Sequence, residues 1–298
     1  MLEKRSRLAS VRKALAYVAL ILAAFYSFWP IMIMGFEGYD IDLAPIFSGK
    51  GVSVVAGVLR YNSGGIHPTP IHYLDALRVN GFLGLMGNTL SVSAIGIAIA
   101  LVAGVTVAYA LARVNIRGKG AISYMLLALR AVSPFIVVVP LYIVYNQIGL
   151  WNTYLGTALA EELLILSVVV WMLRGFFSDI PQEIYDAAAI SGASEWQIFR
   201  RVALRMVIPG IVVTALFAFV LIWNEFVIAD IITGPATKTV AVGVWTGLGE
   251  NTQAFKVIRF DDLNAAGFLA WIPAIGVMLA IRRYLAKGFS LGTASSQS

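Results

Sequence analysis

Long runs of apolar residues recur along the chain and are separated by shorter polar segments. The apolar runs lie near residues 14–36, 87–112, 121–146, 154–175, 209–232 and 263–285. Each run is long enough to cross a hydrocarbon core of about 30 Å at a helical rise of about 1.5 Å per residue. The pattern therefore predicts an all-α polytopic membrane protein with six transmembrane helices.

The fourth and fifth runs are separated by a polar, basic segment, residues 179–209, with the spacing of two short amphipathic helices. Asp179 and Gln182 predict an N-cap and its capping-box partner for the first helix, because both side chains can satisfy free backbone N–H groups. Gly192 predicts the end of that helix, since glycine adopts the left-handed conformation without a steric penalty.

A second short helix is predicted to follow, with Ser194 as its N-cap and Gln197 as the capping-box partner. Trp196 and Phe199 then lie at helical spacing. The pattern alone fits two interpretations equally well. The helix pair lies on the lipid headgroups, or it forms a surface that another protein binds.

The composition excludes an ordinary soluble protein. Hydrophobic residues make up 59% of the 298 residues, and the mean hydropathy is +0.83, far above soluble averages. The net charge is +6, but the basic residues lie beside apolar runs, where they orient a membrane protein. The chain has no cysteine, which excludes disulfides, iron–sulfur clusters and cysteine–zinc sites. The first apolar run is too long for a signal peptide and lacks a small-residue cleavage site, so we expect it to remain as a span.

The basic residues are distributed unevenly between the two sets of connecting loops. Fifteen lysines and arginines lie in the termini and in the loops on one side of the membrane, and six lie on the other side. Loops that are rich in lysine and arginine remain in the cytoplasm. Both termini and residues 179–209 are therefore expected to face the cytoplasm.

This topology divides the chain into five segments. They are a basic cytoplasmic N-terminus (1–13), a first transmembrane helix (14–36), an external loop (37–86), a five-helix core (87–285) with a cytoplasmic loop at 178–208, and a cytoplasmic tail (286–298). The external loop is rich in glycine and proline and is expected to have little regular structure. It contains both histidines of the chain, His67 and His72, but the prolines between them argue against a metal site.

Residues 186–194, DAAAISGAS, followed by Phe199 and Pro209, resemble the EAA loop of ABC importer permeases. Further matches to that family occur in the expected order through most of the chain. They are residues 109–113 with 117–118, 140–142, 149–156, 223–226, Pro273, Tyr284 and 288–292. Residues 223–226, WNEF, are similar to the maltose-type branch, which imports carbohydrates.

The resemblance is not complete within the loop. Asp186 stands where the motif has glutamate, and Ser191 stands where it has aspartate before the glycine. Arg205 lies near the place of an expected proline.

The resemblance implies the type I ABC importer permease fold, in which a cytoplasmic coupling helix between spans 4 and 5 docks into a groove on a separate ATPase. The residues implied in ATPase coupling are Tyr185, Asp186, Ala187, Ala188, Gly192, Ala193, Trp196 and Phe199. The implied partners are an ATP-binding subunit dimer, a second permease that is a different chain, an extracellular or periplasmic solute-binding protein, a sugar and the lipid bilayer. ATP and Mg are expected on the ATPase, with no cofactor or metal in this chain. The implied location is a prokaryotic plasma membrane.

Charged residues at membrane depth need an explanation, because insertion scales place the cost of each at about 2.5–3.5 kcal/mol. They are Arg130 in the third run, Glu161 and Glu162 in the fourth, and Glu225 and Asp230 in the fifth. One interpretation is a substrate path that some of these charged residues line, with Arg130 among the candidates. In this path Asn224 and Glu225 would bind sugar hydroxyls. Trp223 and Phe226 would stack on a sugar face there. The other interpretation is internal pairing that fixes helix packing, which is favoured for Arg130.

The chain contains no G-x-x-x-x-G-K-[ST] phosphate loop and no nucleophile–base pair in an aqueous domain. We therefore expect a non-catalytic permease subunit of an ABC importer for a mono- or oligosaccharide, with ATP hydrolysis on another chain. Alternatives are an importer of glycerol phosphate, a polyamine or an anion, an ion-coupled secondary transporter that uses the membrane carboxylates, and a membrane scaffold. Breaks in the helices, which suit a transport path, are predicted at Pro134, Pro140 and Pro273.

Overall fold

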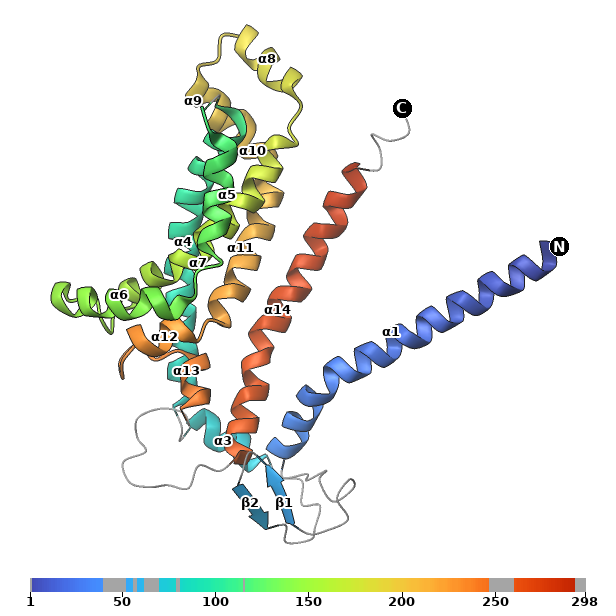
Figure 1. The fold of residues 1–298 in the computed structure, drawn as a ribbon, viewed down its shortest axis with the longest axis vertical. Coiled ribbons are helices and arrows are strands. Elements are labelled where there is room, and N and C mark those ends of the chain that lie inside the picture. Colours follow the sequence, from blue (N-terminus) through green and yellow to red (C-terminus); the bar gives the residue numbers. More distant parts are fainter. Residues whose placement is uncertain are drawn as a thin grey trace. The chain divides into compact units, whose positions relative to one another are not determined.

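The computed structural model describes residues 2–39, 52–55, 58–61, 70–78, 81–114, 116–246 and 260–292. The chain forms two compact units (Figure 1). The first contains Met1–Asn80 and Phe255–Leu269, and the second contains Gly81–Ala254 and Ala270–Ser298.

The described residues of the first unit form three helices or parts of helices and a hairpin. They are α1 (Leu2–Gly38), β1 (Val52–Val55), β2 (Val58–Tyr61), α3 (Ile71–Arg78) and the beginning of α14 (Phe260–Gly292). The two strands are antiparallel, with Val52 opposite Tyr61. The hairpin and α3 give the expected external loop more regular structure than its glycine and proline content predicted.

Tyr73 on α3 connects the described parts of this unit. Its hydroxyl donates a hydrogen bond to the Gly35 carbonyl at 2.9 Å, and its ring lies 4.7 Å from the Tyr39 ring and 6.2 Å from the Phe268 ring, between centroids. Burial, together with the neighbouring Tyr39, raises the pKa of Tyr73 to about 12. The Tyr73 hydroxyl therefore stays neutral and able to donate throughout the physiological range.

His72 is buried beside Tyr73, and its Nδ1 lies 2.7 Å from Oδ1 of Asp262 on α14. The imidazole therefore ties α3 to α14, which is a structural role. His67, the other histidine, lies outside the described residues.

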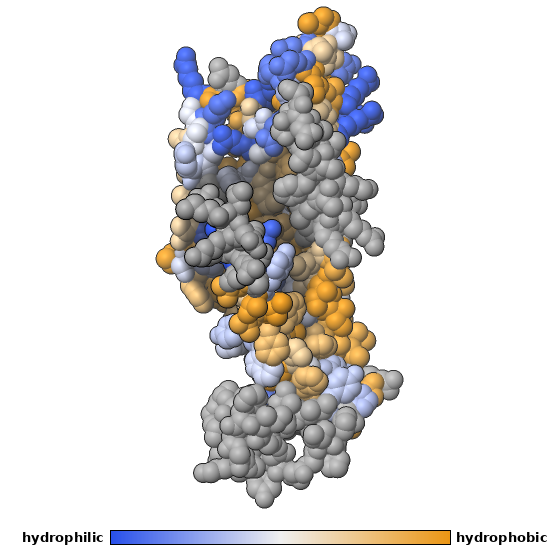
Figure 2. Space-filling view, turned by 90° about the vertical axis from the view of Figure 1, so that its right-hand side faces the viewer, coloured by the Kyte–Doolittle hydropathy of each residue, from blue (hydrophilic) through white to orange (hydrophobic). Residues whose placement is uncertain are grey.

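The second unit is almost entirely helical. Its elements are α4 (Phe82–Arg113), α5 (Lys119–Leu129), α6 (Pro134–Ile148), α7 (Tyr154–Ser178), α8 (Gln182–Ile190), α9 (Glu195–Gln197), a π-helix (Ile198–Ala203), α10 (Leu204–Met206), α11 (Ile208–Trp223), α12 (Val227–Ile232), α13 (Val240–Trp245) and the remainder of α14. Helices α4, α7 and α11 pack side by side and provide most of its core (Figure 1). Hydrophilic residues gather at the end that carries α8 and α9 (Figure 2).

Glycines allow the three central helices to approach closely. A Cβ atom at Gly104 on α4 would lie 2.6 Å from Cγ1 of Val169 on α7, and a Cβ atom at Gly210 on α11 would lie 2.4 Å from the Phe176 ring. Neither position accepts a side chain without a shift of its neighbour. Small residues at helix contacts are a general feature of membrane bundles.

The apolar pattern predicted continuous spans that the structure divides. Among the described residues, four helices are long and apolar enough to cross a membrane, and a fifth candidate is the pair 195–206 and 208–223, which is bent by 68°. The break predicted at Pro134 is confirmed within the third predicted span, 121–146, because α5 ends at Leu129 and α6 begins at Pro134. The residue before a proline is driven away from the helical region, and Ser133 is accordingly extended.

The other two prolines do not break helices as predicted. Pro140 lies inside α6 and Pro273 lies inside α14. A break not attributable to proline divides the fifth predicted span, since α11 ends at Trp223 and α12 begins at Val227.

Candidate functional site

The polar segment after α7 begins with the helix α8. The N-cap of α8 is not the residue that the sequence predicted. The N-cap of α8 is Pro181, with no side-chain cap, whereas Asp179 is the C-cap residue of α7. Asp179 lies two residues before the N-cap, where its carboxylate is not the capping group. The side chain of Gln182 contacts Arg113 and donates to Asp186 at 2.9 Å instead. The predicted capping box at Asp179 is therefore wrong.

The end of α8 follows the prediction. Gly192 has a φ of 81°, in the left-handed region. Its N–H donates to the Ala189 carbonyl, and the N–H of Ala193 donates to the Ala188 carbonyl. These two bonds are the Schellman pattern, which satisfies the last free carbonyls of a helix.

The second predicted cap is confirmed, but the helix that it starts is not a simple α-helix. Ser194 and Gln197 form a reciprocal capping box at the start of α9. The chain then widens into a π-helix at Ile198–Ala203. Such segments commonly occur at functional sites.

Two side chains from the end of α4 anchor this loop to the bundle. The Arg113 guanidinium lies 3.8 Å from the centre of the Tyr185 ring on α8. Burial is the main cause that raises the pKa of the Tyr185 hydroxyl, so the phenol stays neutral. The Tyr109 ring lies 5.5 Å from Phe177 of α7 and 4.7 Å from Phe199 of the π-helix, between centroids.

The residues implied in coupling divide into an anchoring set and an exposed set. Tyr185 and Phe199 are buried, and Ala188 and Ala193 pack partly against the core. The exposed members are Asp186, Ala187, Gly192 and Trp196, the last with 64% of its surface accessible. Ile190, which the sequence analysis did not include, is 88% exposed. The exposed part of the loop therefore includes two large apolar side chains, Ile190 on α8 and Trp196 on α9, beside small residues.

The predicted path residues lie at the break between α11 and α12, and most are occupied by local contacts. The Trp223 indole is 4% exposed and donates to the Ala270 carbonyl at 3.0 Å. The Glu225 carboxylate accepts from the backbone N–H groups of Ile228 and Ala229. Trp223 therefore packs helices in this structure and offers no open face for a sugar.

The two neighbours of these residues remain more accessible. Asn224 is exposed and its amide donates to the Val220 carbonyl at 2.8 Å. Phe226 is half-buried, with its ring 5.6 Å from the Trp245 ring, between centroids. Of the four predicted path residues at this break, these two are the ones that could still meet a solute.

Arg130 and the two glutamates of α7 do not form the pair that was favoured. Arg130 is exposed in the turn between α5 and α6, and it makes no ion pair within the part of the chain that the structure describes. Glu161 is 1% exposed, and Glu162 is half-buried. The carboxylate oxygens of both glutamates lack a hydrogen-bond partner among the described residues.

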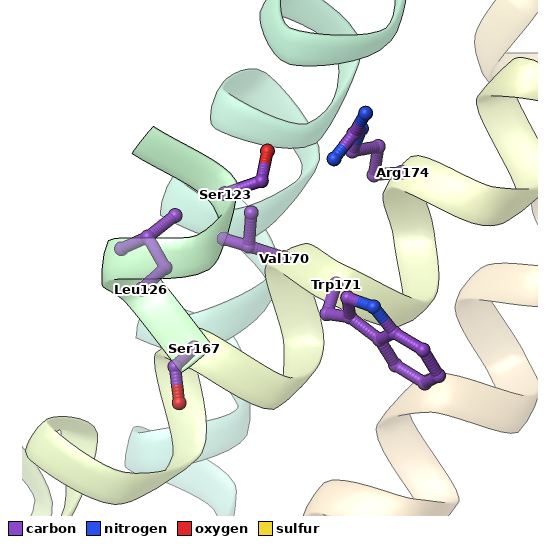
Figure 3. A pocket seen from close by; sticks show the side chains of 6 residues that line it. All are labelled: Ser123, Leu126, Ser167, Val170, Trp171 and Arg174. Atoms are coloured by element: carbon purple, nitrogen blue, oxygen red, sulfur yellow. The ribbon is translucent and has the colours of Figure 1, made fainter. Parts of the chain in front are cut away.

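A small hollow lies between α5 and α7 (Figure 3). Ser123, Ser167 and Arg174 line it together with three apolar side chains. Its volume of about 10 Å³ matches roughly one water molecule. The hollow is therefore too small for a solute.

Polar side chains that the sequence analysis missed hold the opposite end of the second unit. Asn152 has a positive φ of 57°, and its Oδ1 accepts hydrogen bonds from the Gly234 N–H and from the Thr237 N–H and hydroxyl. Thr89 on α4 accepts from the Val240 N–H at 2.8 Å. These contacts join segments more than 80 residues apart, which no local pattern could indicate.

The chain matches the family described as binding-protein-dependent transport system inner membrane component over residues 96–289, more than half of its length. The probable ABC transporter permease protein y4oR of Sinorhizobium fredii is 29% identical over 226 residues, which cover 76% of this chain and 79% of the relative. The diacetylchitobiose uptake system permease protein NgcG of Streptomyces coelicolor is 30% identical over 206 residues, which cover 69% of this chain and 68% of the relative.

A solved structure shows the same fold. It is a bacterial ABC transporter involved in the import of the acidic polysaccharide alginate, and one of its chains matches with a TM-score of 0.68 at 18% identity, covering 92% of this chain and 96% of that chain. The family match, the relatives and the apolar helices agree with one another. The chain belongs to the binding-protein-dependent transport system inner membrane components, the permeases of ABC importers, and is a multi-pass membrane protein.

Proposed function

We propose that this permease is a subunit of an ATP-driven importer for a sugar, either a mono- or an oligosaccharide. The relative NgcG belongs to a diacetylchitobiose uptake system, and the structural neighbour takes part in the import of alginate. Both compounds are built of linked sugar units. Asn224 and Phe226, an amide beside an aromatic ring at the break after α11, are the groups through which this chain would meet the solute.

The observation that carries the coupling role is the exposure of two large apolar side chains in the same loop, Ile190 and Trp196. A partner protein that binds this loop would remove both side chains from water, which favours association. The opposite side of the same loop is fixed to α4 and α7 through Tyr185 and Phe199. A separate ATPase that grips Ile190 and Trp196 would therefore move the transmembrane helices together with the loop.

The remaining arrangement of the importer follows from this role. The chain would cross a prokaryotic plasma membrane six times, with both termini and the α8–α10 loop in the cytoplasm, as the distribution of basic residues predicts. The segment boundaries at residues 13, 36, 86 and 285 belong to the same proposal. A second permease, a different chain, would complete the path, and an external binding protein would deliver the sugar. ATP and Mg would bind to the ATPase dimer, with no cofactor in this chain.

Affinity purification of the tagged chain from its own membranes tests this proposal. Mass spectrometry is expected to identify a phosphate-loop ATPase and a second permease with the wild type. The Gly192→Val variant should lose the ATPase, because a β-branched residue is strained at a φ of 81° by more than about 1–2 kcal/mol. Space is not the cause, since nothing lies within 4 Å of a Cβ atom at Gly192.

The matched control is Gly192→Asn, which should retain the ATPase because asparagine tolerates the left-handed conformation. Uptake of a labelled disaccharide, with unlabelled sugars, glycerol phosphate and a polyamine as competitors, then identifies the solute. Recovery of the chain alone, or uptake that follows a proton gradient and ignores ATP, would refute the proposal.

A further inference from the structure

Trp245, the last residue of α13, is an exposed aromatic residue that the sequence analysis did not include. Its surface is 77% accessible, and its ring lies 5.6 Å from the Phe226 ring, between centroids, with 63° between the ring planes. The indole therefore rests against the break between α11 and α12 with most of its surface open. It lies at the place where Asn224 and Phe226 remain accessible.

Contacts with α4 hold α13 in place. The Val240 N–H, at the first residue of α13, donates to the Thr89 hydroxyl at 2.8 Å. Gly243 packs so closely against the Leu85 side chain that a Cβ atom there would clash. A packed helix therefore presents Trp245, and the position of its ring does not depend on a free loop.

Asp230 on α12 is a charged residue of the fifth predicted span that the proposed function does not yet use. Its N–H donates to the Phe226 carbonyl at 2.8 Å, which places the two residues one helical turn apart, with roughly 5–6 Å between Cβ atoms. Ile228, Ala229 and Ile232 of the same helix are buried. Asp230 is exposed and makes no ion pair within the part of the chain that the structure describes. The carboxylate therefore lies on the open side of α12, near the aromatic pair.

Two aromatic rings beside a carboxylate and an amide suit the binding of a sugar ring. The C–H groups on one face of a pyranose can pack on the negative face of an aromatic ring. The Asp230 carboxylate can accept hydrogen bonds from two neighbouring hydroxyls, and a charged acceptor makes the stronger bond. An acyl chain of a lipid offers the carboxylate no donor, and a charge against hydrocarbon is costly. A neutral sugar therefore fits this surface better than a lipid does.

We propose that Trp245 and Asp230, together with Phe226, bind one sugar ring of the solute and select a neutral sugar over an acidic one. The Asp230 charge repels the carboxylate of a uronic acid, which is the physical basis of the selection. The inference rests on the proposed function for the import of a sugar, and it adds two residues and a class of sugar. Helices α12 and α13 lie toward the end of the second unit opposite α8 (Figure 1). The proposed orientation therefore places these residues in the external half, where a solute enters.

The first experiment asks whether water and sugar reach Trp245 in the intact complex. The chain has no cysteine, so Thr246→Cys, at an exposed position beside Trp245, gives it a single thiol. We expect a polar maleimide to label this thiol in the complex held in lipid nanodiscs. A transported disaccharide, chosen from maltose, trehalose and diacetylchitobiose, should slow the labelling when it is added with the binding protein. Val102→Cys, 74% exposed on α4, is the control whose labelling rate should not respond to sugar.

The outcomes of this labelling separate the inference from the proposed function. A thiol that stays unlabelled, or labelling that the transported disaccharide does not slow, would overturn the inference. Uptake of the disaccharide by the same complex would leave the proposed function standing. Uptake of spermidine with no uptake of any disaccharide would overturn both.

The second experiment removes the indole and measures uptake in proteoliposomes. We expect Trp245→Ala to lower disaccharide uptake by roughly fivefold, the effect of one lost aromatic contact, while ATP hydrolysis stimulated by the loaded binding protein continues. Trp245→Phe should recover most of the uptake, because it keeps an aromatic face. Trp171→Ala, which removes another exposed tryptophan, 58% accessible on α7, should leave uptake unchanged. Equal uptake by Trp245→Ala and the wild type would overturn the inference.

The third experiment tests the charge with Asp230→Asn, which keeps an acceptor oxygen and removes the charge. The measured quantity is the ratio of the uptake of a neutral disaccharide to the uptake of digalacturonate. The variant and the wild type are assayed with the same binding protein, so its own preference cancels from the comparison. We expect the ratio to fall roughly tenfold in Asp230→Asn, because the like-charge repulsion is lost. An unchanged ratio would contradict selection by Asp230 and would overturn the inference.

Discussion

The Arg113 guanidinium lies 3.8 Å above the ring of Tyr185 and joins the last turn of a membrane helix to the loop outside it. Arg113 also contacts the Gln182 side chain. A cation over an aromatic ring contributes about 0.5–2 kcal/mol, depending on its exposure. This contact can therefore transmit a displacement of α8 to α4.

Substitution of Arg113 should loosen that transmission. In Arg113→Gln, we expect ATP hydrolysis to continue while uptake falls several-fold, because the loop moves without carrying α4. Arg113→Lys should give a ratio of ATP hydrolysed to solute transported between those of the wild type and Arg113→Gln, since lysine keeps the charge but not the planar group. The measurement is the number of ATP molecules hydrolysed per solute in proteoliposomes.

Tyr185→Phe provides the control for this contact. The Tyr185 hydroxyl has no hydrogen-bond partner among the described residues, and phenylalanine retains the ring beneath Arg113. We expect an unchanged ratio of ATP to solute. A loss as large as that of Arg113→Gln would show that the hydroxyl, and not the ring, is the contact.

Ile190 and Ile184 lie on the same helix and should respond in opposite ways. Ile190→Ser should leave the melting temperature of the detergent-solubilised chain unchanged, because the side chain is 88% exposed, but should reduce ATPase recovery. Ile184→Ser should lower the melting temperature, since Ile184 packs against the core. Thermal unfolding of the isolated chain and ATPase co-purification measure the two effects. Equal ATPase recovery with Ile190→Ser and the wild type would argue against the exposed face as the docking surface.

Glycine at position 104 is expected to be essential for packing. Gly104→Ala should destabilise the second unit by about 1–3 kcal/mol, because the new Cβ would lie 2.6 Å from Val169 Cγ1. Gly175→Ala, in the long helix α7, should cause no loss of stability, since nothing lies within 4 Å of that Cβ. Both substitutions change helix propensity from glycine to alanine, but only Gly104→Ala introduces a clash. The difference between the two melting temperatures therefore measures the effect of the clash with Val169.

Asn152 should be needed for the stability of the end of the second unit that lies opposite α8. Asn152→Ala leaves buried donors at Gly234 and Thr237 without their acceptor, and each such loss costs about 1–3 kcal/mol. Asn152→Asp keeps an acceptor oxygen and should be much milder. Hydrogen exchange at residues 234–240 measures the effect, and equal exchange in Asn152→Ala and the wild type would contradict this role.

The sequence could predict the features that depend on neighbouring residues. The capping box of Ser194 and Gln197 and the helix end at Gly192 need only a few consecutive side chains, so both were correct. The prediction of Asp179 as the N-cap was wrong, because Pro181, two residues later, is the N-cap and α8 begins after it. The EAA-like segment also indicated the family before any geometry was known.

Features that depend on contacts between distant segments could not be predicted in this way. The break at Pro134 was predicted from the proline, whereas no proline marks the break between Trp223 and Val227. The burial of Trp223 requires Ala270, 47 residues later, as its hydrogen-bond acceptor. Likewise, no periodicity places Asn152 opposite Thr237 or widens residues 198–203 into a π-helix.

The close approach at Gly104 also limits how the bundle can deform. Val169 of α7 packs directly against Gly104 of α4. We expect α4 and α7 to move together as one rigid pair, because even a small gap between them would lose much of their van der Waals attraction. A lateral parting of these two helices would break that fit along its length. We therefore expect that, if the loop is displaced, the bundle bends at two breaks between its helices, residues 130–133 between α5 and α6 and residues 224–226 between α11 and α12.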